Sequence, residues 1–245
     1  MKTCLLLLVV LLLSVVTVHA DIYVKQHAQT DEYYFGGQVS PALDSENEFW
    51  LGDNKILFAT EQRLIIIDKN ENKLIFANKS DSTYAETTLP LDWMKFVPED
   101  FAGRLKMFET VGTVEATSET RMIEGFNCTA YKGNLYIPYQ GTKYNERDVT
   151  LWITTDLPEA TKTFSAIAHD IFKLRNYKED FITELVKIDG FQILEETMNY
   201  QQGMSYTSTE TVVEVSEKEA PEGTYTLPEW FKKKELLSRE DLQDG

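Results

Sequence analysis

Short apolar runs separated by very short polar connections fill the region between residues 48 and 89, and they constrain the fold more than any other feature. The runs are residues 48–51, 55–60, 63–68, 73–78 and 83–89, and their composition is typical of β-strands. Parallel strands need a crossover of a dozen or more residues, so connections this short allow only hairpins. The region therefore predicts an antiparallel meander, and the wholly apolar stretch 64–67 predicts a strand covered on both faces.

Further strands are predicted on both sides of this meander. Residues 22–30 open with a period-two alternation, and the polar segment 31–47, with Gly36 and Gly37, is expected to be a mobile loop. Long strands at 191–200 and 205–216 are expected to pair around Gln-Gln-Gly. The remaining strands are predicted at residues 112–116, 121–123, 126–131 and 148–155.

Helical periodicity is clearest in residues 158–174. Apolar side chains recur there at i, i+3, i+4, i+7 and i+8, and the sheet is the large partner against which this stripe can pack. Helices are also predicted after Pro98 and over 178–188, and Ser238 to Asp241 form a capping box. No linker divides the chain, so we predict one α+β domain over residues 21–245.

The first 20 residues have the layout of a secretory signal peptide. Lys2 precedes an apolar run over residues 5–18, and small residues at Val18 and Ala20 suit cleavage after Ala20. The run is shorter than the roughly 20 residues that a membrane anchor needs. We therefore expect a mature protein that does not span a membrane and is periplasmic or secreted.

Charge and cysteine content narrow the functional class. The chain has 40 acidic and 24 basic side chains, a formal charge of −16, which becomes −17 when Lys2 is removed. Such a protein repels nucleic acids and anionic lipids. Cys128 is the one cysteine after the leader, so no intramolecular disulfide is expected.

Four local patterns resemble one family. They are Gly125-Phe126-Asn127-Cys128-Thr129-Ala130-Tyr131, Trp152-Ile153-Thr154-Thr155-Asp156-Leu157-Pro158, Gly190-Phe191-Gln192-Ile193 and Pro221-Glu222-Gly223-Thr224-Tyr225-Thr226-Leu227-Pro228. In this order they resemble an uncharacterised secreted bacterial family, a domain of unknown function whose layout is similar to that of the periplasmic lipoprotein carriers of LolA and LppX type.

The resemblance implies a strongly curved antiparallel sheet, a half-barrel with helices packed on its concave face. In the carriers that face holds acyl chains, although a shared fold does not fix a shared function. This chain departs from the carriers because its helix face carries the bulky Phe164, Ile171 and Phe172, which could fill the concavity.

No catalytic, metal or cofactor site is predicted. His27 and His169 are isolated, and the run Asp68 to Asn72 imitates a calcium loop but has Lys73 where glycine is needed, so we expect a hairpin turn. Cys128 lacks a neighbouring cation in its sequence and is expected to be a buried apolar residue. Adjacent carboxylates such as Glu195 and Glu196 point to opposite faces of a strand.

Aromatic side chains are the remaining candidates for a site. In a half-barrel they could line an apolar pocket, while aromatic residues on strands and helix faces are ordinarily core residues. Both interpretations remain open for Trp50, Trp93, Tyr131, Trp152, Phe164 and Phe172.

Three functions follow from these features. The first is a binding module that holds an apolar ligand, a lipid or an acylated lipoprotein in the concave face. The second is an envelope interaction or sensing protein with a filled core, which recognises its partner through a sheet edge or through residues 31–47. The third, a hydrolase with an unrecognised site, has no catalytic constellation in its favour, so we expect a protein that is not an enzyme and needs no cofactor.

Overall fold

The computed structural model describes residues 20–201 and 203–242. The predicted signal peptide lies outside this part of the chain except for Ala20, which directly precedes the first strand. Within the described residues, none of the helices combines the length and the apolar character needed to cross a membrane.

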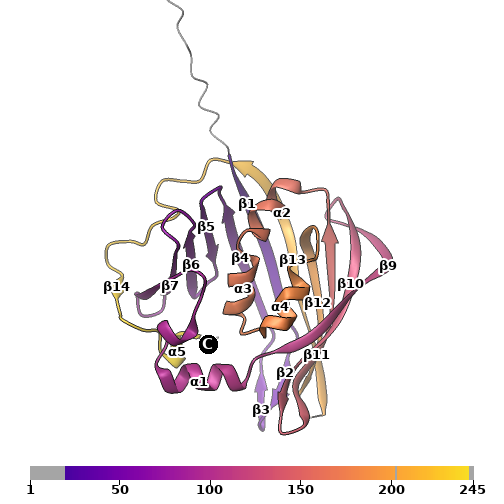
Figure 1. Cartoon of the computed structure of the whole chain (residues 1–245). Helices are drawn as coiled ribbons and strands as arrows, with labels where there is room; N and C mark the ends of the chain where they lie inside the picture. Colours follow the sequence, from indigo (N-terminus) through magenta and orange to yellow (C-terminus); the bar gives the residue numbers. More distant parts are fainter. Residues whose placement is uncertain (1–19, 202, 243–245) are drawn as a thin grey trace, which may run out of the picture.

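A large curved sheet dominates the described part of the chain (Figure 1). Its 12 strands lie in the order β14-β8-β7-β6-β5-β4-β1-β13-β12-β11-β10-β9. All neighbours are antiparallel except β14 and β8, and the sheet ends at β14 and β9 without closing. The strands are β1 Asp21–Thr30, β4 Leu43–Leu51, β5 Lys55–Ala59, β6 Arg63–Asp68, β7 Lys73–Asn78, β8 Thr83–Thr88, β9 Val111–Ile123, β10 Phe126–Tyr139, β11 Thr142–Thr154, β12 Phe191–Gln201, β13 Met204–Lys218 and β14 Lys232–Lys233. The prediction of a curved antiparallel α+β fold is confirmed.

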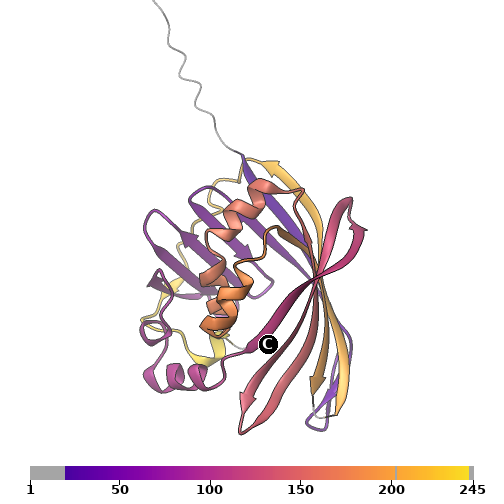
Figure 2. The ribbon, with the colours of Figure 1, turned by 45° about the vertical axis from the view of Figure 1, so that its right-hand side comes forward.

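Helices lie inside the curve of the sheet, as Figure 2 shows. The predicted helix 158–174 is two helices, because the chain turns at Ala166 and Ile167, and the φ of Ile167 is −128°. The break leaves Ile167 and Ile171 buried against the sheet. The helices are η1 Trp93–Lys95, α1 Glu99–Met107, α2 Pro158–Ser165, α3 Ala168–Leu174, α4 Glu179–Leu185 and α5 Arg239–Leu242.

The segment 31–47, predicted to be a loop, contains a hairpin and the start of β4. Strands β2 Tyr33–Phe35 and β3 Gln38–Ser40 pair around Gly36 and Gly37, whose φ angles are +58° and +88°. Two successive residues with positive φ suit the tight turns that match strand twist, and glycine adopts them without strain. The polar composition concealed these short strands, which do not have a buried face to impose an apolar alternation.

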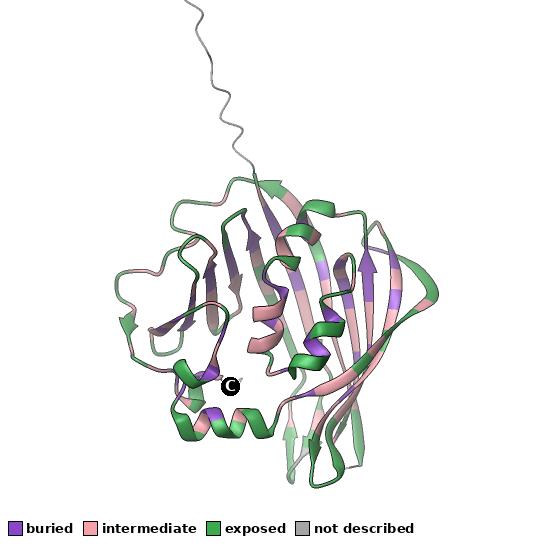
Figure 3. Ribbon diagram, in the orientation of Figure 1, coloured by how far each residue is buried: buried purple, intermediate pink, exposed green. Residues whose placement is uncertain are grey.

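The core covers both faces of the sheet around β6. On the concave face Ile67, Leu74 and Phe96 are fully or almost fully buried. On the other face a C-terminal strap, residues 219–228, covers a second cluster formed by Tyr23, Trp50, Leu57 and Ile66, with Ala220, Tyr225 and Leu227 packed on it. The strand with apolar residues at every position is thus covered on both faces, as predicted, and Figure 3 shows buried residues gathered on β4 to β7 and on the inner sides of the helices.

Candidate functional site

The concave face beneath α2, α3 and α4 is filled by side chains. Ile182 of α4 is fully buried and Ile167 is 2% exposed. Phe181 and Ile182 share a cluster with Leu135 and Val149 of the sheet. The sequence left open whether bulky helix residues fill this space; in the structure Ile171 is buried, and Phe164 and Phe172 are partly buried against the core clusters.

Two of the six candidate aromatics meet in this interface. The rings of Phe164 and Phe172 lie 6.2 Å apart, edge to face, and Phe164 packs in the same way on Phe191 at 6.2 Å. Phe172 also stacks on Tyr177 at 6.1 Å. These contacts make a helix-to-sheet aromatic cluster.

Trp50 and Trp93 lie elsewhere. Trp50 alternates with the concave residue Leu51 on β4 and packs on Tyr23, with ring centroids 4.9 Å apart, beneath the C-terminal strap. It therefore faces away from the helices and does not line the concave face. Trp93 is buried in η1, and its indole N–H donates to the carbonyl of Lys173 at 3.2 Å, which ties η1 to α3.

Trp152 and Tyr131 occupy neighbouring strands. The indole N–H of Trp152 donates to the carboxylate of Glu196 at 2.7 Å, and the guanidinium of Arg121 lies 4.4 Å from its ring centroid. Tyr131 is half-buried on β10 opposite Leu151 of β11. The structure thus disperses the six aromatics, and a shared pocket lined by all of them is not formed.

The residues weighed for catalysis or metal binding have local partners. A nitrogen of His27 lies 2.6 Å from Asp44, and one of His169 lies 2.7 Å from Glu179. Asp68 accepts backbone N–H groups at 3.0 and 3.1 Å in the β6–β7 turn, which confirms the predicted hairpin. In the described residues no group of three or more His, Cys, Asp and Glu side chains is placed to hold a metal ion. Cys128 is 1% exposed, and burial raises the pKa of its thiol.

A set of charged side chains lies on the central strands of the concave face. This charged patch comprises Arg147, Arg175, Glu195 and Glu210, and the neutral Gln26 lies beside Glu210. Glu195 of β12 and Glu210 of β13 are directly paired in the sheet, and Arg175, which follows α3, lies 3.8 Å from each carboxylate. The amide of Gln26 donates to Glu210 at 3.3 Å. Sequence reasoning missed this patch because its members are far apart along the chain.

Burial raises the pKa of Glu210. The positive charge of Arg175 opposes this effect, while the neighbouring charge of Glu195 adds to it. Like charges directly opposite each other on paired strands destabilise a sheet unless a cation or a proton separates them. The guanidinium of Arg175 supplies the cation between the two carboxylates. A charged surface of this kind is poorly suited to contact an acyl chain.

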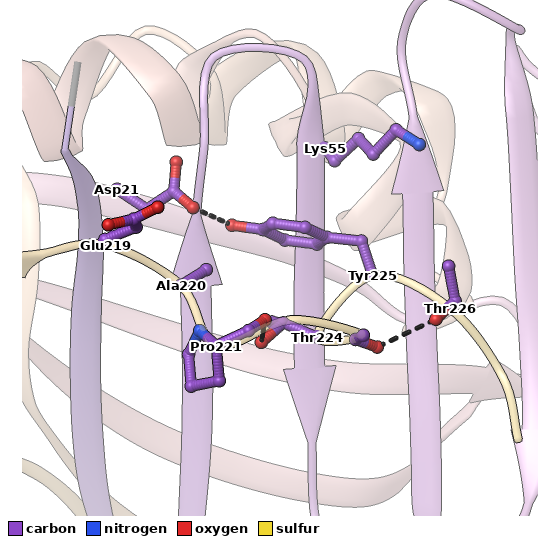
Figure 4. Close-up of a pocket in the computed structure, with 9 residues that line it drawn as sticks. Asp21, Lys55, Glu219, Ala220, Pro221, Thr224, Tyr225 and Thr226 are labelled. Carbon is purple, nitrogen blue, oxygen red and sulfur yellow. Dashed lines mark hydrogen bonds between the residues drawn. The ribbon is translucent and has the colours of Figure 1, made fainter. Parts of the chain in front are cut away.

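The C-terminal strap forms the edge of a pocket of about 370 Å³ on the opposite face (Figure 4). The Tyr225 hydroxyl donates to Asp21 at 2.8 Å, so the strap is held to the first strand, and burial together with this bond raises the pKa of Tyr225. Lys55 and Glu219 also line the pocket. The last of the four family-like patterns, Pro221 to Pro228, thus contains the tyrosine that holds the strap to β1.

A second pocket of about 330 Å³ lies between strands at the other edge of the sheet. Its lining residues are Val111, Gly112, Thr113, Asn134, Tyr136 and Lys143. Helices contribute no residue to either pocket, so neither one is the carrier-like cavity between sheet and helices.

Exposed apolar side chains gather at one end of the half-barrel, where the β10–β11 and β12–β13 hairpins turn and β1 leads into the β2–β3 hairpin. Stacked rings connect Tyr33 of β2 with Tyr206 of β13 at 4.1 Å, and Phe108, which follows α1, with Tyr139 of β10 at 5.6 Å. Of the 14 large apolar or aromatic side chains exposed in the described part of the chain, nine belong to this tip surface. They are Tyr34, Val39, Leu43, Met107, Phe108, Tyr139, Tyr144, Tyr200 and Met204.

The chain matches no known family and no curated protein. Two solved structures resemble it at 7% identity. An uncharacterised conserved protein from Thermus thermophilus has a TM-score of 0.43 and covers 87% of this chain and 90% of its own. A DUF1329 family protein from Desulfovibrio piger has a TM-score of 0.30 and covers 93% of both chains. These neighbours are uncharacterised or belong to a domain family of unknown function, so they leave the activity open.

Proposed function

We propose that the mature chain is an exported interaction protein that recognises another protein of the envelope through the tip surface. The observation that carries the proposal is the concentration of exposed apolar side chains at one end of a half-barrel whose interior is filled by its own helices. Large exposed apolar patches on soluble proteins mark interaction sites.

The composition of the tip surface supports a protein partner. Tyrosine, phenylalanine and methionine are enriched at protein interfaces, and methionine adapts to irregular partner surfaces. The segments that carry them are separate in sequence, so the sheet is what brings them together. The rest of the surface contributes to a formal charge of −16, which keeps such a protein soluble while one end stays apolar.

The carrier hypothesis has less support from the geometry. A cavity for a drug-sized apolar ligand occupies about 300 to 1,000 Å³ with apolar walls. Here Ile167 and Ile182 fill the space beneath the helices, and the central concave strands carry Glu195, Glu210 and Arg175. The hydrolase hypothesis gains no support either, because the same arginine pairs with both carboxylates.

The proposal is tested with matched triple variants. One carries Tyr34→Ser, Val39→Ser and Leu43→Ser in the tip surface. The control carries Met94→Ser, Met122→Ser and Trp230→Ser, which are exposed apolar residues outside it. Chemical cross-linking in the native envelope identifies the partner, and the dissociation constant is then measured with the purified partner.

We expect the tip variant to weaken binding at least tenfold and the control to leave it unchanged. Retention of wild-type affinity in the tip variant, or the absence of any cross-linked partner, would overturn the proposal. Circular dichroism of both variants shows that the fold is intact.

A further inference from the structure

A row of polar side chains crosses the concave face, and it begins at Arg147 of the charged patch. Arg147 of β11 is paired with Asn199 of β12, which is paired with Tyr206 of β13. Directly paired residues project from the same face of a sheet. Arg147 lies two positions before Val149, which packs in one cluster with Phe181 of α4, so this row faces the helix side.

Arg147 has a buried donor without an acceptor. Its Nε atom is buried and has no hydrogen-bond partner, and among the described residues Arg147 takes part in no ion pair. A guanidinium offers five N–H donors in a rigid fork that matches a carboxylate or a phosphate. A buried donor without a partner destabilises a protein, so an acceptor at this position would stabilise this one.

The neighbours of Arg147 are themselves hydrogen-bonding groups. Asn199 donates to the hydroxyl of Ser208 at 3.1 Å, which orients the amide. The ring of Tyr206 stacks on Tyr33 at 4.1 Å with 11° between the planes, so its phenol is held in place on the same face. Guanidinium, amide and phenol groups in one row are typical of sites that bind an oxyanion.

Glu210, the carboxylate that interacts electrostatically with Arg147, already has other partners. Glu210 is within the electrostatic reach of Arg147, but its side chain is 3.8 Å from Arg175 and accepts a bond from Gln26 at 3.3 Å. With Glu195 the patch holds two carboxylates and two guanidinium groups. Because the pKa of Glu210 is raised, uptake of one proton leaves this set with a net positive charge.

We propose that the concave face binds a small oxyanion, a carboxylate or a phosphate group, with Arg147 as the bidentate anchor and Asn199 and Tyr206 beside it. This site borders the tip surface at Tyr206 and Asn199, and the anion titration below tests it separately from the cross-linking of a protein partner. Binding brings a negative charge next to Glu210 and therefore favours its protonated form. The groups that face Glu210 are Gln26, Arg147, Arg175 and Glu195, and Tyr177 faces Arg175.

The test is an NMR titration of the ¹⁵N-labelled mature chain. Benzoate and phenyl phosphate are the anionic probes, and benzamide is the uncharged control of the same shape as benzoate. We expect both anions, or one of them, to shift amide signals of β11, β12 and β13, and benzamide to leave them in place. The anion that binds identifies a carboxylate or a phosphate as the preferred group. Affinity should rise as the pH is lowered through the raised pKa of Glu210, because Glu210 then takes up a proton.

Variants decide whether Arg147 is the anchor. Arg147→Gln should weaken anion binding at least tenfold, Arg147→Lys should recover part of it, and Arg104→Gln on exposed α1 should change nothing. If Arg147→Gln fails to fold, Asn199→Asp, which places a negative charge in the same row, should abolish binding. Two results would overturn the inference. One is the absence of shifts at millimolar anion, and the other is wild-type anion affinity in Arg147→Gln or Asn199→Asp.

Discussion

Replacing Ile182 by alanine tests whether the helices fill the half-barrel. Ile182 is fully buried between α4 and the sheet, where Leu135 and Val149 form the opposite wall. Loss of three carbon atoms removes about 2.4 kcal/mol of transfer free energy at roughly 0.8 kcal/mol per carbon. The strand backbone cannot collapse into the space, so a cavity contribution raises the expected cost to about 3 to 4 kcal/mol.

Urea denaturation followed by circular dichroism measures this change in the free energy of unfolding. The midpoint should fall while the slope stays constant, because the exposed surface on unfolding is nearly unchanged. Val186→Ala, at the end of the same helix and 43% exposed, is the control and should cost less than about 0.5 kcal/mol. A cost below about 1 kcal/mol for Ile182→Ala would show that the space behind α4 is loosely packed, and it would refute the filled interior.

Two further predictions concern buried polar groups. Cys128 is 1% exposed and burial raises its pKa, so alkylating reagents should label it only after unfolding, and rapid labelling of the native protein would contradict this placement. For Asp241, burial raises the pKa, but the donors Lys234 and Ser238 outweigh that effect and lower it. A carboxyl whose pKa is lower in the folded state contributes stability above its unfolded pKa and loses it as the pH falls through its folded pKa. The wild type should therefore lose up to about 1 kcal/mol more than Asp241→Asn between about pH 6 and pH 3 in urea denaturation, and parallel pH profiles would contradict this role.

The meander was predictable because local rules suffice for it. Short polar turns fix hairpins, and β5 to β8 lie where the apolar runs place them. The break between α2 and α3 was missed because the apolar stripe continues through it, and only tertiary packing on the sheet reveals the turn at Ile167. Strands β10 and β11 extend further than predicted, to Tyr139 and from Thr142, because polar side chains there pair across strands without an apolar alternation.

The candidate sites were less accessible to sequence reasoning. The pairing of Glu195 with Glu210 and the approach of Arg175 depend on the register of β12 and β13 and on the end of α3. The aromatic residues were proposed as pocket lining, but the face of the sheet to which each one points depends on strand parity, which places Trp50 on the side of the strap. The sequence shows that segment 31–47 contains apolar residues. That these residues lie beside the other hairpins becomes clear only from the strand order of the sheet.

Native mass spectrometry of the protein purified from its native source tests the central claim most directly. If the helices fill the half-barrel, the protein should carry the mass of the bare polypeptide, and extraction with organic solvent should release no lipid. A stoichiometric apolar species that survives purification and leaves on extraction would contradict a filled interior and restore the carrier hypothesis.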